Sequence, residues 1–394
     1  MIYDGQCGME EPQPHLRGPT PPRRRPCQTV AAANMRPATS SEELRKRNST
    51  RRTVLQTLAR FLRPTGHQSR QGNAASTRPR HRSKKSNCAS DEQGCSQVSG
   101  RHEAQQGSQL GVAHLGKFAH EKEMPQWLAK ALVKNGYVSA HDMIPVLAQL
   151  LEHSSGTVRA YLCHPCVQHI SKLRREGGFC GYRNIQMLIS YIIGAKAFGA
   201  EVFGNRVPSV FDIQDLIEAA WDMGHNPQGR IETGGIKGTR KFIGTSEAQA
   251  LFNSLQIPSP VQSFRDSEDG AAASKLLQAI DHYFKAGCGG NDESKKVQTT
   301  SLPPVYLQHQ GHSLTVVGIE ERKDGRLNLL VFDPSCRDSA VLKRHVGRRV
   351  CKDMAGAGDL AEPYRRGAKY LIKQKEFEIL CLSSKTRTSA SETL

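Results

Sequence analysis

The sequence lacks the features of membrane-spanning and secreted proteins. It has no apolar run of about 18 residues, the length that a helix needs to cross a bilayer. Proline, glutamine and charged residues occur early in the chain, where a secretory signal peptide would carry an apolar segment. The 11 cysteines are scattered without the spacing of a disulfide framework. We therefore expect reduced thiols, no membrane partner, and a location in the nucleus and cytoplasm.

The sequence also lacks the common motifs for nucleotide phosphates and zinc. Six glycines fall within 224–244, but no G-x-x-x-x-G-K-[ST] loop accompanies them. Cys163, His164, Cys166 and His169 could form half of a zinc site, but a closed site takes four ligands, usually from two separated pairs, and no second pair follows. We interpret Cys166 and His169 as packing residues that share a helix face. We therefore predict that the protein binds neither a metal ion nor a cofactor.

Positive charge is concentrated in the N-terminal part of the chain. The formal net charge is +18, of which residues 1–110 carry +11, with 19 Lys and Arg against 8 Asp and Glu. These residues are rich in Pro, Ser, Gln, Gly and Arg, a composition typical of disorder, and only 53–62 has a short helical pattern. Basic clusters at 23–25 and 78–85 indicate nuclear import or weak contact with nucleic-acid phosphates; the alternative is a solvated basic tail.

The composition predicts three regions. They are a disordered basic tail at 1–110, an ordered domain at 111–385, and a disordered C-terminal tail at 386–394. In the first tail, Cys88 and Cys95 are separated by six residues and have no histidine pair at finger spacing. We therefore expect no zinc finger there.

A cysteine in a glycine turn precedes the clearest helical pattern of the ordered region. The turn reads Gly-Gly-Phe-Cys at 177–180, and the following helix is predicted over about 182–196. Its apolar residues at helical spacing are Ile185, Leu188, Ile189 and Ile192. A thiol at a helix N-terminus meets unpaired N–H groups and the positive end of the helix dipole, which favour the thiolate. Cys180 is therefore a candidate nucleophile, and the alternative is a buried structural cysteine.

Other patterns predict a mixed α+β domain. Residues 120–134 contain a proline-started helix, with Pro125 in its first turn, and amphipathic or capped segments predict helices at 144–151, 210–223, 245–255 and 274–284. Segments rich in β-branched and aromatic residues predict strands at 305–310, 313–319 and 327–332.

His312 begins one of these strands, and Asp333 ends the next. With a two-residue turn at 324–325, Asp333 would lie opposite Val316, about 13 Å along the strand from His312. With a six-residue connection at 320–325, Asp333 would lie opposite His312, with β-carbons about 5 Å apart. Only the second register is expected to let the carboxylate orient the imidazole. Taken singly, His312 could equally be a surface histidine, and Asp333 could equally be part of a turn at the end of a strand.

Three motifs resemble those of one peptidase family. Cys-Gly-Tyr-Arg-Asn-Ile-Gln-Met-Leu at 180–188 resembles the nucleophile motif of the ubiquitin-fold-modifier-specific cysteine peptidases, the UFSP family. The resemblance is closest to the zinc-finger-containing branch, which cleaves polyubiquitin. Tyr-Leu-Gln-His-Gln-Gly-His-Ser at 306–313 resembles the histidine motif of that branch, and Asp333-Pro334 resembles its aspartate motif.

Further similarity at 120–127, 242–247 and 377–380 extends the resemblance over about 111–383. It implies an α+β, papain-like cysteine peptidase fold, with the nucleophile helix packed on an antiparallel sheet. Two departures stand out. The branch carries zinc fingers and ubiquitin-binding helices before its catalytic domain, and 1–110 shows no such pattern. Many relatives also have Trp and Gly immediately before the cysteine, where this chain has Gly and Phe, which bears on the groove for the substrate tail.

The resemblance implies a thiol-dependent peptidase or isopeptidase that cleaves after the C-terminal glycine of ubiquitin, as a deubiquitinase acting on polyubiquitin. Cys180 would be the nucleophile, His312 the general base and acid, and Asp333 the orienting carboxylate. The Cys180 N–H and the Gln308 side chain would bind the oxyanion, with Gln310 in reserve. If the strand is regular, Gln308, Gln310 and His312 face the same side.

Three other functions stay open at this point. The first is a protease for the ubiquitin-fold modifier itself, and the second is a non-catalytic ubiquitin-binding module with a vestigial triad. The presence of all three triad residue types argues against the second. The third is a nucleic-acid-binding protein, but the basic tail has no interleaved aromatic residues, which weakens that interpretation.

Overall fold

A computed structural model describes residues 116–268, 270–288, 295–348 and 360–383. The two predicted tails lie outside these residues, together with the basic clusters, the short helical pattern and the two cysteines of the first tail. Within the described ranges, no helix combines the length and the apolar character needed to cross a membrane.

Each predicted helix of the ordered region is present. The longer helices are α2 (Gln126–Asn135), α3 (Met143–His153), α4 (Cys180–Gly194), α6 (Val210–Asp222), α8 (Thr245–Ser254) and α9 (Ala271–Ala286). The short ones are the 3₁₀ turns η1 (Gly116–Phe118) and η2 (Glu362–Tyr364), and α5 (Ala200–Phe203), α7 (Gln228–Thr233), α10 (Ala340–Lys343) and α12 (Ala368–Leu371). Pro125 immediately precedes α2, in agreement with the proline-started helix predicted within 120–134. Helix α6 begins with a capping box formed by Ser209 and Asp212.

The strands of the described residues form two sheets. Their bounds are β1 (Val138–Ala140), β2 (Thr157–Leu162), β3 (His169–Ser171), β4 (Val261–Arg265), β5 (Val297–Thr299), β6 (Val305–His309), β7 (His312–Arg322), β8 (Leu327–Phe332), β9 (Arg365–Gly367) and β10 (Glu376–Cys381). Strand β1 pairs with β3. The larger sheet has the order β4-β10-β6-β7-β2-β5, and β8 joins it beside β7 and carries β9. Only the β2–β5 pair is parallel, so the predicted α+β class with an antiparallel sheet is confirmed.

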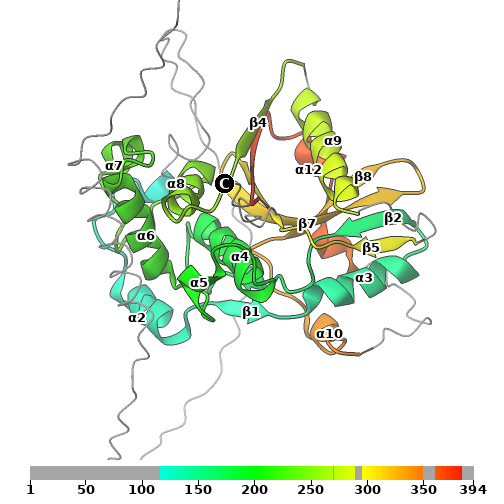
Figure 1. Cartoon of the computed structure of the whole chain (residues 1–394), viewed down its shortest axis with the longest axis horizontal. Helices are drawn as coiled ribbons and strands as arrows, with labels where there is room; N and C mark the ends of the chain where they lie inside the picture. The colour runs from blue at the N-terminus through cyan, green and yellow to red at the C-terminus, as the bar shows by residue number, and fades with distance from the viewer. Residues whose placement is uncertain (1–115, 269, 289–294, 349–359, 384–394) are drawn as a thin grey trace, which may run out of the picture. The chain divides into compact units, whose positions relative to one another are not determined.

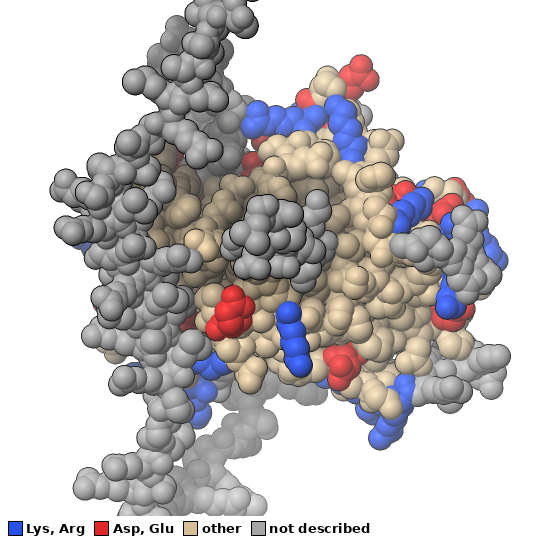
Figure 2. Space-filling model, viewed as in Figure 1, with Lys and Arg blue, Asp and Glu red and all other residues tan. Residues whose placement is uncertain are grey.

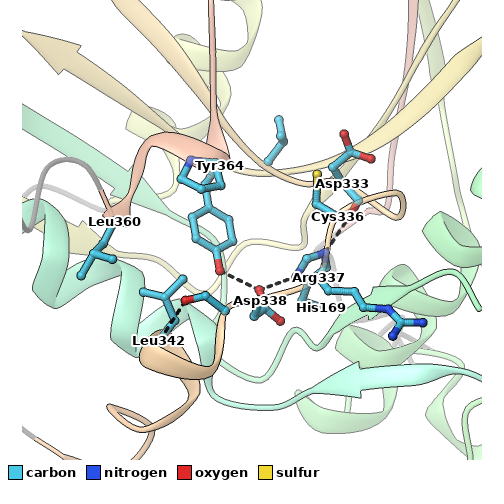
Figure 3. Close-up of a pocket in the computed structure, with 11 residues that line it drawn as sticks. His169, Asp333, Cys336, Arg337, Asp338, Leu342, Leu360 and Tyr364 are labelled. Atoms are coloured by element: carbon cyan, nitrogen blue, oxygen red, sulfur yellow. Dashed lines mark hydrogen bonds and ion pairs between the residues drawn. The ribbon is translucent and has the colours of Figure 1, made fainter. Parts of the chain in front are cut away.

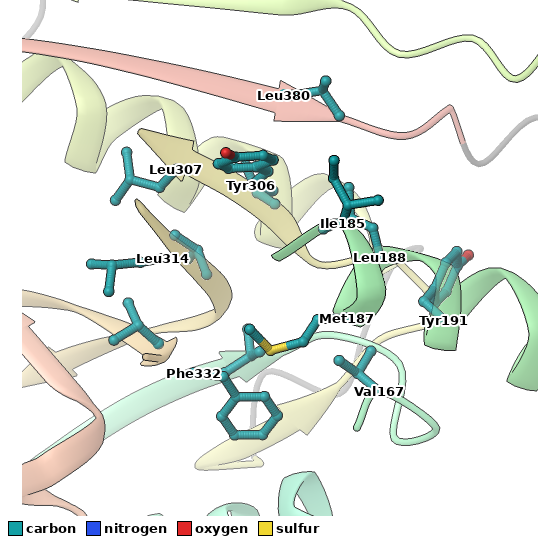
Figure 4. Close-up of a cluster of buried hydrophobic side chains, with 14 of the residues drawn as sticks. Val167, Ile185, Met187, Leu188, Tyr191, Tyr306, Leu307, Leu314, Phe332 and Leu380 are labelled. Atoms are coloured by element: carbon teal, nitrogen blue, oxygen red, sulfur yellow. The ribbon is translucent and has the colours of Figure 1, made fainter. Parts of the chain in front are cut away.

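Helix α4 is the central element of the fold. Figure 1 shows it between β7 and a group of helices that includes α6 and α8. Figure 4 shows Ile185 and Leu188 of α4 in one buried cluster with Tyr306 of β6. Every side chain from Cys180 to Ile192 is buried, so the helix has no exposed face over this length. Burial of each large apolar side chain contributes about 1.5–3 kcal/mol, which fixes the helix that carries Cys180.

The turn between β7 and β8 is shorter than the predicted connection at 320–325. Strand β7 continues through Arg322, whose N–H donates to the carbonyl oxygen of Arg326 at 2.9 Å. Val317 forms a bulge in β7, because Val316 and Gly318 pair with consecutive residues of β8. The bulge adds a residue to one strand and so shifts every pair beyond it.

Both predicted registers are wrong, because the pair next to the turn, Glu321 with Leu327, already differs from each of them, and the bulge shifts the remaining pairs by one more residue. Thr315 pairs with Phe332, so the next position along places Asp333 opposite Leu314. That position is two residues from His312, whereas the two predictions placed Asp333 opposite His312 or four residues from it. A diagonal neighbour at this spacing remains within reach of a long side chain. The expectation that only directly opposed residues could meet is therefore also wrong.

Candidate active site

Cys180 is the first residue of α4 and is 8% exposed. The chain before it passes close to a neighbouring segment. A β-carbon on Gly178 would lie 2.2 Å from the ring of Phe242, and one on Gly181 would lie 2.5 Å from the carbonyl oxygen of Ile243. Glycine is required at both positions because the two segments approach so closely. The turn therefore delivers the thiol to the start of the helix, where backbone N–H groups are unpaired.

Phe179, which departs from the pattern of many relatives, lies in the core. It is fully buried, and its ring packs edge-on against Tyr182 with centroids 5.2 Å apart. Its side chain therefore belongs to the packing that anchors α4, and does not line a groove on the surface.

A buried ion pair holds the loop that leads to Cys180. Arg183 donates from Nε to Glu176 Oε1 at 2.9 Å and from Nη2 to Oε2 at 2.6 Å, and both side chains are fully buried. Glu176 also accepts the N–H of Leu173 at 2.7 Å, which ties the loop to itself. Loss of one partner of a buried pair costs about 3–5 kcal/mol, because the other charge is left without compensation.

His312 and Asp333 form a hydrogen-bonded pair. His312 is the first residue of β7, and Asp333 directly follows β8. His312 Nε2 donates to Asp333 Oδ1 at 2.9 Å, and the N–H of Ser335 donates to the same oxygen at 2.8 Å. Because Nε2 is engaged with the carboxylate, Nδ1 is the ring nitrogen left for the Cys180 sulfur. The structure therefore brings together the three residues that the sequence singled out.

The pKa values of the thiol and the imidazole favour an ion pair. Burial raises the pKa of the Cys180 thiol, but hydrogen bonding and charge from His312, a hydrogen bond from Ser313 and the charge of Lys172 lower it to about 7. Burial lowers the pKa of His312, but its hydrogen bonds to Asp333 and Cys180 raise it to about 9. Between these values the sulfur is a thiolate and the ring is an imidazolium.

Asp333 has a further partner that the sequence did not reveal. Arg366, on β9, donates from Nη2 to Asp333 Oδ2 at 2.9 Å, and its guanidinium lies 5.3 Å from the ring centre of Tyr370. Burial raises the pKa of the Asp333 carboxyl, but the hydrogen bonds from His312, Ser335 and Arg366 hold that pKa well below its usual range. Arg366 stands in an Arg-Arg-Gly stretch that indicates no contact with Asp333, because that contact depends on the pairing of β9 with β8.

The candidate oxyanion residue Gln308 lies on the face of the sheet that meets α4. Strand β6 ends at His309 and β7 begins with His312, with a two-residue turn at 310–311 whose glycine has a φ of 78°. The chain is therefore not one regular strand from 308 to 312, and the condition under which these three residues would face the same side does not hold. Gln308 instead pairs with Ser313, so these two side chains share a face.

Three buried polar side chains connect that face to the nucleophile helix. Asn184, one turn beyond Cys180, donates from Nδ2 to Ser313 Oγ at 2.8 Å and accepts from Thr315 Oγ1 at 2.8 Å. Thr315 thus fixes the orientation of the amide, and the amide fixes the oxygen of Ser313. The hydroxyl hydrogen of Ser313 is left to donate elsewhere, and hydrogen bonding from Ser313 lowers the pKa of the Cys180 thiol. No pattern in the sequence indicated this connection, since a polar residue inside a helical pattern is usually exposed.

The cysteines and histidines around residue 166 do not gather into a metal site. The segment is not helical, because Leu162 ends β2 and His169 begins β3, so the predicted shared helix face is wrong. His169 bonds to Asp338 and to the backbone of Asp333. Among the described residues, no three His, Cys, Asp or Glu side chains are grouped so that they could hold a metal ion.

The mixed helix and antiparallel-sheet fold, with its row of sulfur, imidazole and carboxylate, has the arrangement of a cysteine peptidase domain. Residues 156–380 match peptidase family C78, which is more than half of the chain. The chain therefore belongs to peptidase family C78.

Several curated proteins are similar to this chain. Zinc finger-containing ubiquitin peptidase 1 of Mus musculus is 36% identical over 207 residues, which is 52% of this chain and 35% of the relative. The Rattus norvegicus protein of the same name is 34% identical over 253 residues, 64% of this chain and 42% of the relative. Ubiquitin carboxyl-terminal hydrolase mug105 of Schizosaccharomyces pombe is 30% identical over 173 residues, 43% of this chain and 65% of the relative.

This chain therefore spans about two fifths of the length of the mammalian relatives. Among solved structures, UfSP from C. elegans is similar with a TM-score of 0.39 and 13% identity, over 64% of this chain and 38% of that chain.

Proposed function

We propose that this chain is a thiol-dependent peptidase and isopeptidase that cleaves after the C-terminal glycine of ubiquitin, and that it acts as a deubiquitinase on polyubiquitin. The observation that carries the proposal is the convergence of Cys180, His312 and Asp333, with pKa values that favour a thiolate–imidazolium pair. Membership of family C78, and relatives that are named as ubiquitin peptidases, support the choice of substrate.

The reaction divides into acylation and hydrolysis. In acylation, the Cys180 thiolate attacks the carbonyl carbon of the terminal glycine, and a carbon–sulfur bond forms. The carbon–nitrogen bond then breaks, and the His312 imidazolium gives its proton to the leaving amine. In hydrolysis, neutral His312 takes a proton from water as the water attacks the thioester, which releases the carboxylate and restores the thiolate. Asp333 holds the ring and stabilises its charge in both steps.

Cys180 and Gln308 are proposed to bind the oxyanion of the tetrahedral intermediate. The backbone N–H of Cys180 lies at the start of α4, where N–H groups are unpaired. Tyr306 hydroxyl donates to Gln308 Oε1 at 3.4 Å, and Gln308 Nε2 donates to the carbonyl of His309 at 3.2 Å. These contacts hold the amide and leave its second N–H to donate to the substrate oxygen. Gln310 is exposed in the hairpin turn, which favours Gln308.

A substrate panel tests the proposal. The purified protein and its Cys180→Ala variant are incubated with di-ubiquitins of each linkage and with the precursor of the ubiquitin-fold modifier, and products are separated by gel. Cleavage of di-ubiquitin by the wild type alone is the expected result. Cleavage of the modifier precursor alone would instead identify a protease for that modifier. Ubiquitin binding without any cleavage would identify a non-catalytic module, and the proposal would be abandoned.

Location in the nucleus and cytoplasm is part of the proposal, since the 11 cysteines have no disulfide-framework spacing and suit a compartment that keeps thiols reduced. Weak contact with nucleic acid is proposed for residues 1–110 alone, where the excess of positive charge is greatest. In the described residues on the face drawn in Figure 2, Lys and Arg are spread out and intermixed with Asp and Glu. Salt-dependent DNA binding that survives deletion of 1–105 would move this contact to the catalytic domain.

A further inference from the structure

A second imidazole–carboxylate pair lies behind Asp333. His169, on β3, has its Nδ1 2.7 Å from Asp338 Oδ1 and its Nε2 3.0 Å from the backbone carbonyl oxygen of Asp333. The Tyr364 hydroxyl donates to Asp338 Oδ1 at 2.6 Å. Figure 3 shows these side chains converging on Asp338 beneath the end of the strand that leads to Asp333. The His169 ring also stacks on Phe332, with centroids 4.7 Å apart.

The donors and acceptors define the state of this pair. Both ring nitrogens of His169 face oxygens, one of a backbone carbonyl and one of a carboxylate, and an ionised carboxylate only accepts. Burial raises the pKa of the Asp338 carboxyl, but hydrogen bonds from His169 and Tyr364 lower it, so the carboxyl is ionised. The two side chains are 1% and 2% exposed, so this contact is fully buried.

The loop after β8 depends on such bonds for its position. It has neither helix nor strand up to α10, and a cavity of about 170 Å³ lies beside it, lined in part by His169, Asp338 and Tyr364. Packing is therefore incomplete on that side of the loop. The carbonyl of Asp333 accepts from His169 and, at 2.9 Å, from the N–H of Cys336, so two donors fix the backbone of this residue.

We propose that His169, Asp338 and Tyr364 are positioning residues: they hold the Asp333 backbone, and thereby the carboxylate that orients His312. The consequence for turnover rests on the proposed function. The consequence for the Cys180 thiolate does not, because the His312 imidazolium that stabilises the sulfur needs Asp333 whatever the substrate is.

Alkylation of Cys180 by iodoacetamide tests the proposal without a substrate. The rate is measured against pH by mass spectrometry of the peptide that carries Cys180, for the wild type, Asp338→Asn, Asp333→Asn and the double variant. We expect Asp338→Asn to raise the midpoint by about one pH unit, the low end of the effect of a charged partner. In the Asp333→Asn background the same change should add nothing, because its effect passes through Asp333.

The control is Asp212→Asn, which removes a carboxylate from the capping box of α6 and should leave the midpoint unchanged while lowering stability. If Asp338→Asn does not fold, Tyr364→Phe takes its place: it removes one hydroxyl, keeps the ring, and should shift the midpoint in the same direction by less. An unchanged midpoint in the variant that folds would overturn the proposal. A full shift that persists in the Asp333→Asn background would also overturn it. If di-ubiquitin is not cleaved by the wild type, the alkylation result still stands.

Discussion

Two histidine–carboxylate pairs lie on either side of one loop, and they differ in what faces the second ring nitrogen. In the pair of His312 and Asp333, that nitrogen faces the sulfur of Cys180, and the histidine side chain is 22% exposed. In the pair of His169 and Asp338, it faces a backbone carbonyl, and the side chain is 1% exposed. A ring between a carboxylate and a thiol can pass a proton on, whereas a ring between a carboxylate and a carbonyl has no group to receive one.

The difference teaches that the residue types alone do not make a catalytic pair. Both pairs have similar lengths, 2.9 and 2.7 Å, and both carboxylates have pKa values lowered by their histidines. Access and the third group decide the role. The outer pair, His312 with Asp333, is suited to proton transfer. The inner pair, His169 with Asp338, is suited to holding the loop that carries Asp333.

The largest expected effect comes from removing the sulfur. Cys180→Ala should lower kcat by about 10⁵-fold or more, because no thiolate remains to attack the carbonyl. Substrate affinity, measured by titration calorimetry, should stay within a few fold of the wild type, since the substituted side chain is small and buried. Cleavage by this variant at the wild-type rate would remove Cys180 from the mechanism.

Changing Asp333, the carboxylate of the outer pair, should have the next largest effect. Asp333→Asn should lower kcat/KM by up to about 10⁴-fold, because the carboxamide neither stabilises the imidazolium nor fixes its tautomer. The same change at Asp338 should cost about tenfold, since it acts only through the position of Asp333. Equal losses in the two variants, measured with a fluorogenic ubiquitin substrate, would erase the distinction between the pairs.

Removal of the side-chain oxyanion donor should cost less. Gln308→Ala should lower kcat by about 10²-fold, or about 3 kcal/mol of barrier, with little change in KM. Gln310→Ala is the matched control, because this residue is exposed in the adjacent turn and should leave both constants unchanged. The reverse pattern would assign the donor to Gln310.

The smallest effect is the dependence on pH near neutrality. The thiolate is lost as pH falls through the Cys180 pKa of about 7, and the imidazolium is lost as pH rises through the His312 pKa of about 9. We expect a bell-shaped profile of kcat/KM against pH, bounded by these two pKa values. The value of kcat/KM should fall about tenfold per pH unit below the lower pKa and above the higher one. Asp333→Asn should narrow the bell, because the thiol pKa rises as the imidazole pKa falls. A profile that stays flat to pH 5 would contradict the ion pair.

Local patterns were enough to place the elements of the site. Cys180 at the start of a helix, His312 at the start of a strand and Asp333 after the end of the next strand are all where their sequence neighbours predicted them. Helical spacing, a glycine turn and β-rich runs depend on residues within a few positions, so they can be recognised in one chain.

Details that depend on distant segments could not be predicted. The bulge at Val317 sets the register that brings Asp333 within reach of His312, and a bulge leaves no clear mark in the order of residues. Arg366 meets the carboxylate only because β9 pairs with β8. Asn184 was hidden because a polar residue in a helix is normally solvated, and its partners lie more than a hundred positions away.

The sequence by itself determined that a thiol, an imidazole and a carboxylate stand at the ends of regular elements, because the signals for those ends are local. Only the tertiary structure decided which histidine faces the thiol and which faces the backbone. Both histidines lie near cysteines, His169 in the sequence and His312 in the fold. The packing of α4 against β7, and of β3 against α4, separates the ring that faces the thiol from the ring that faces the backbone. The physical reason is that the role of an imidazole depends on the atoms within about 3 Å of its two nitrogens, and folding selects those atoms from the whole chain.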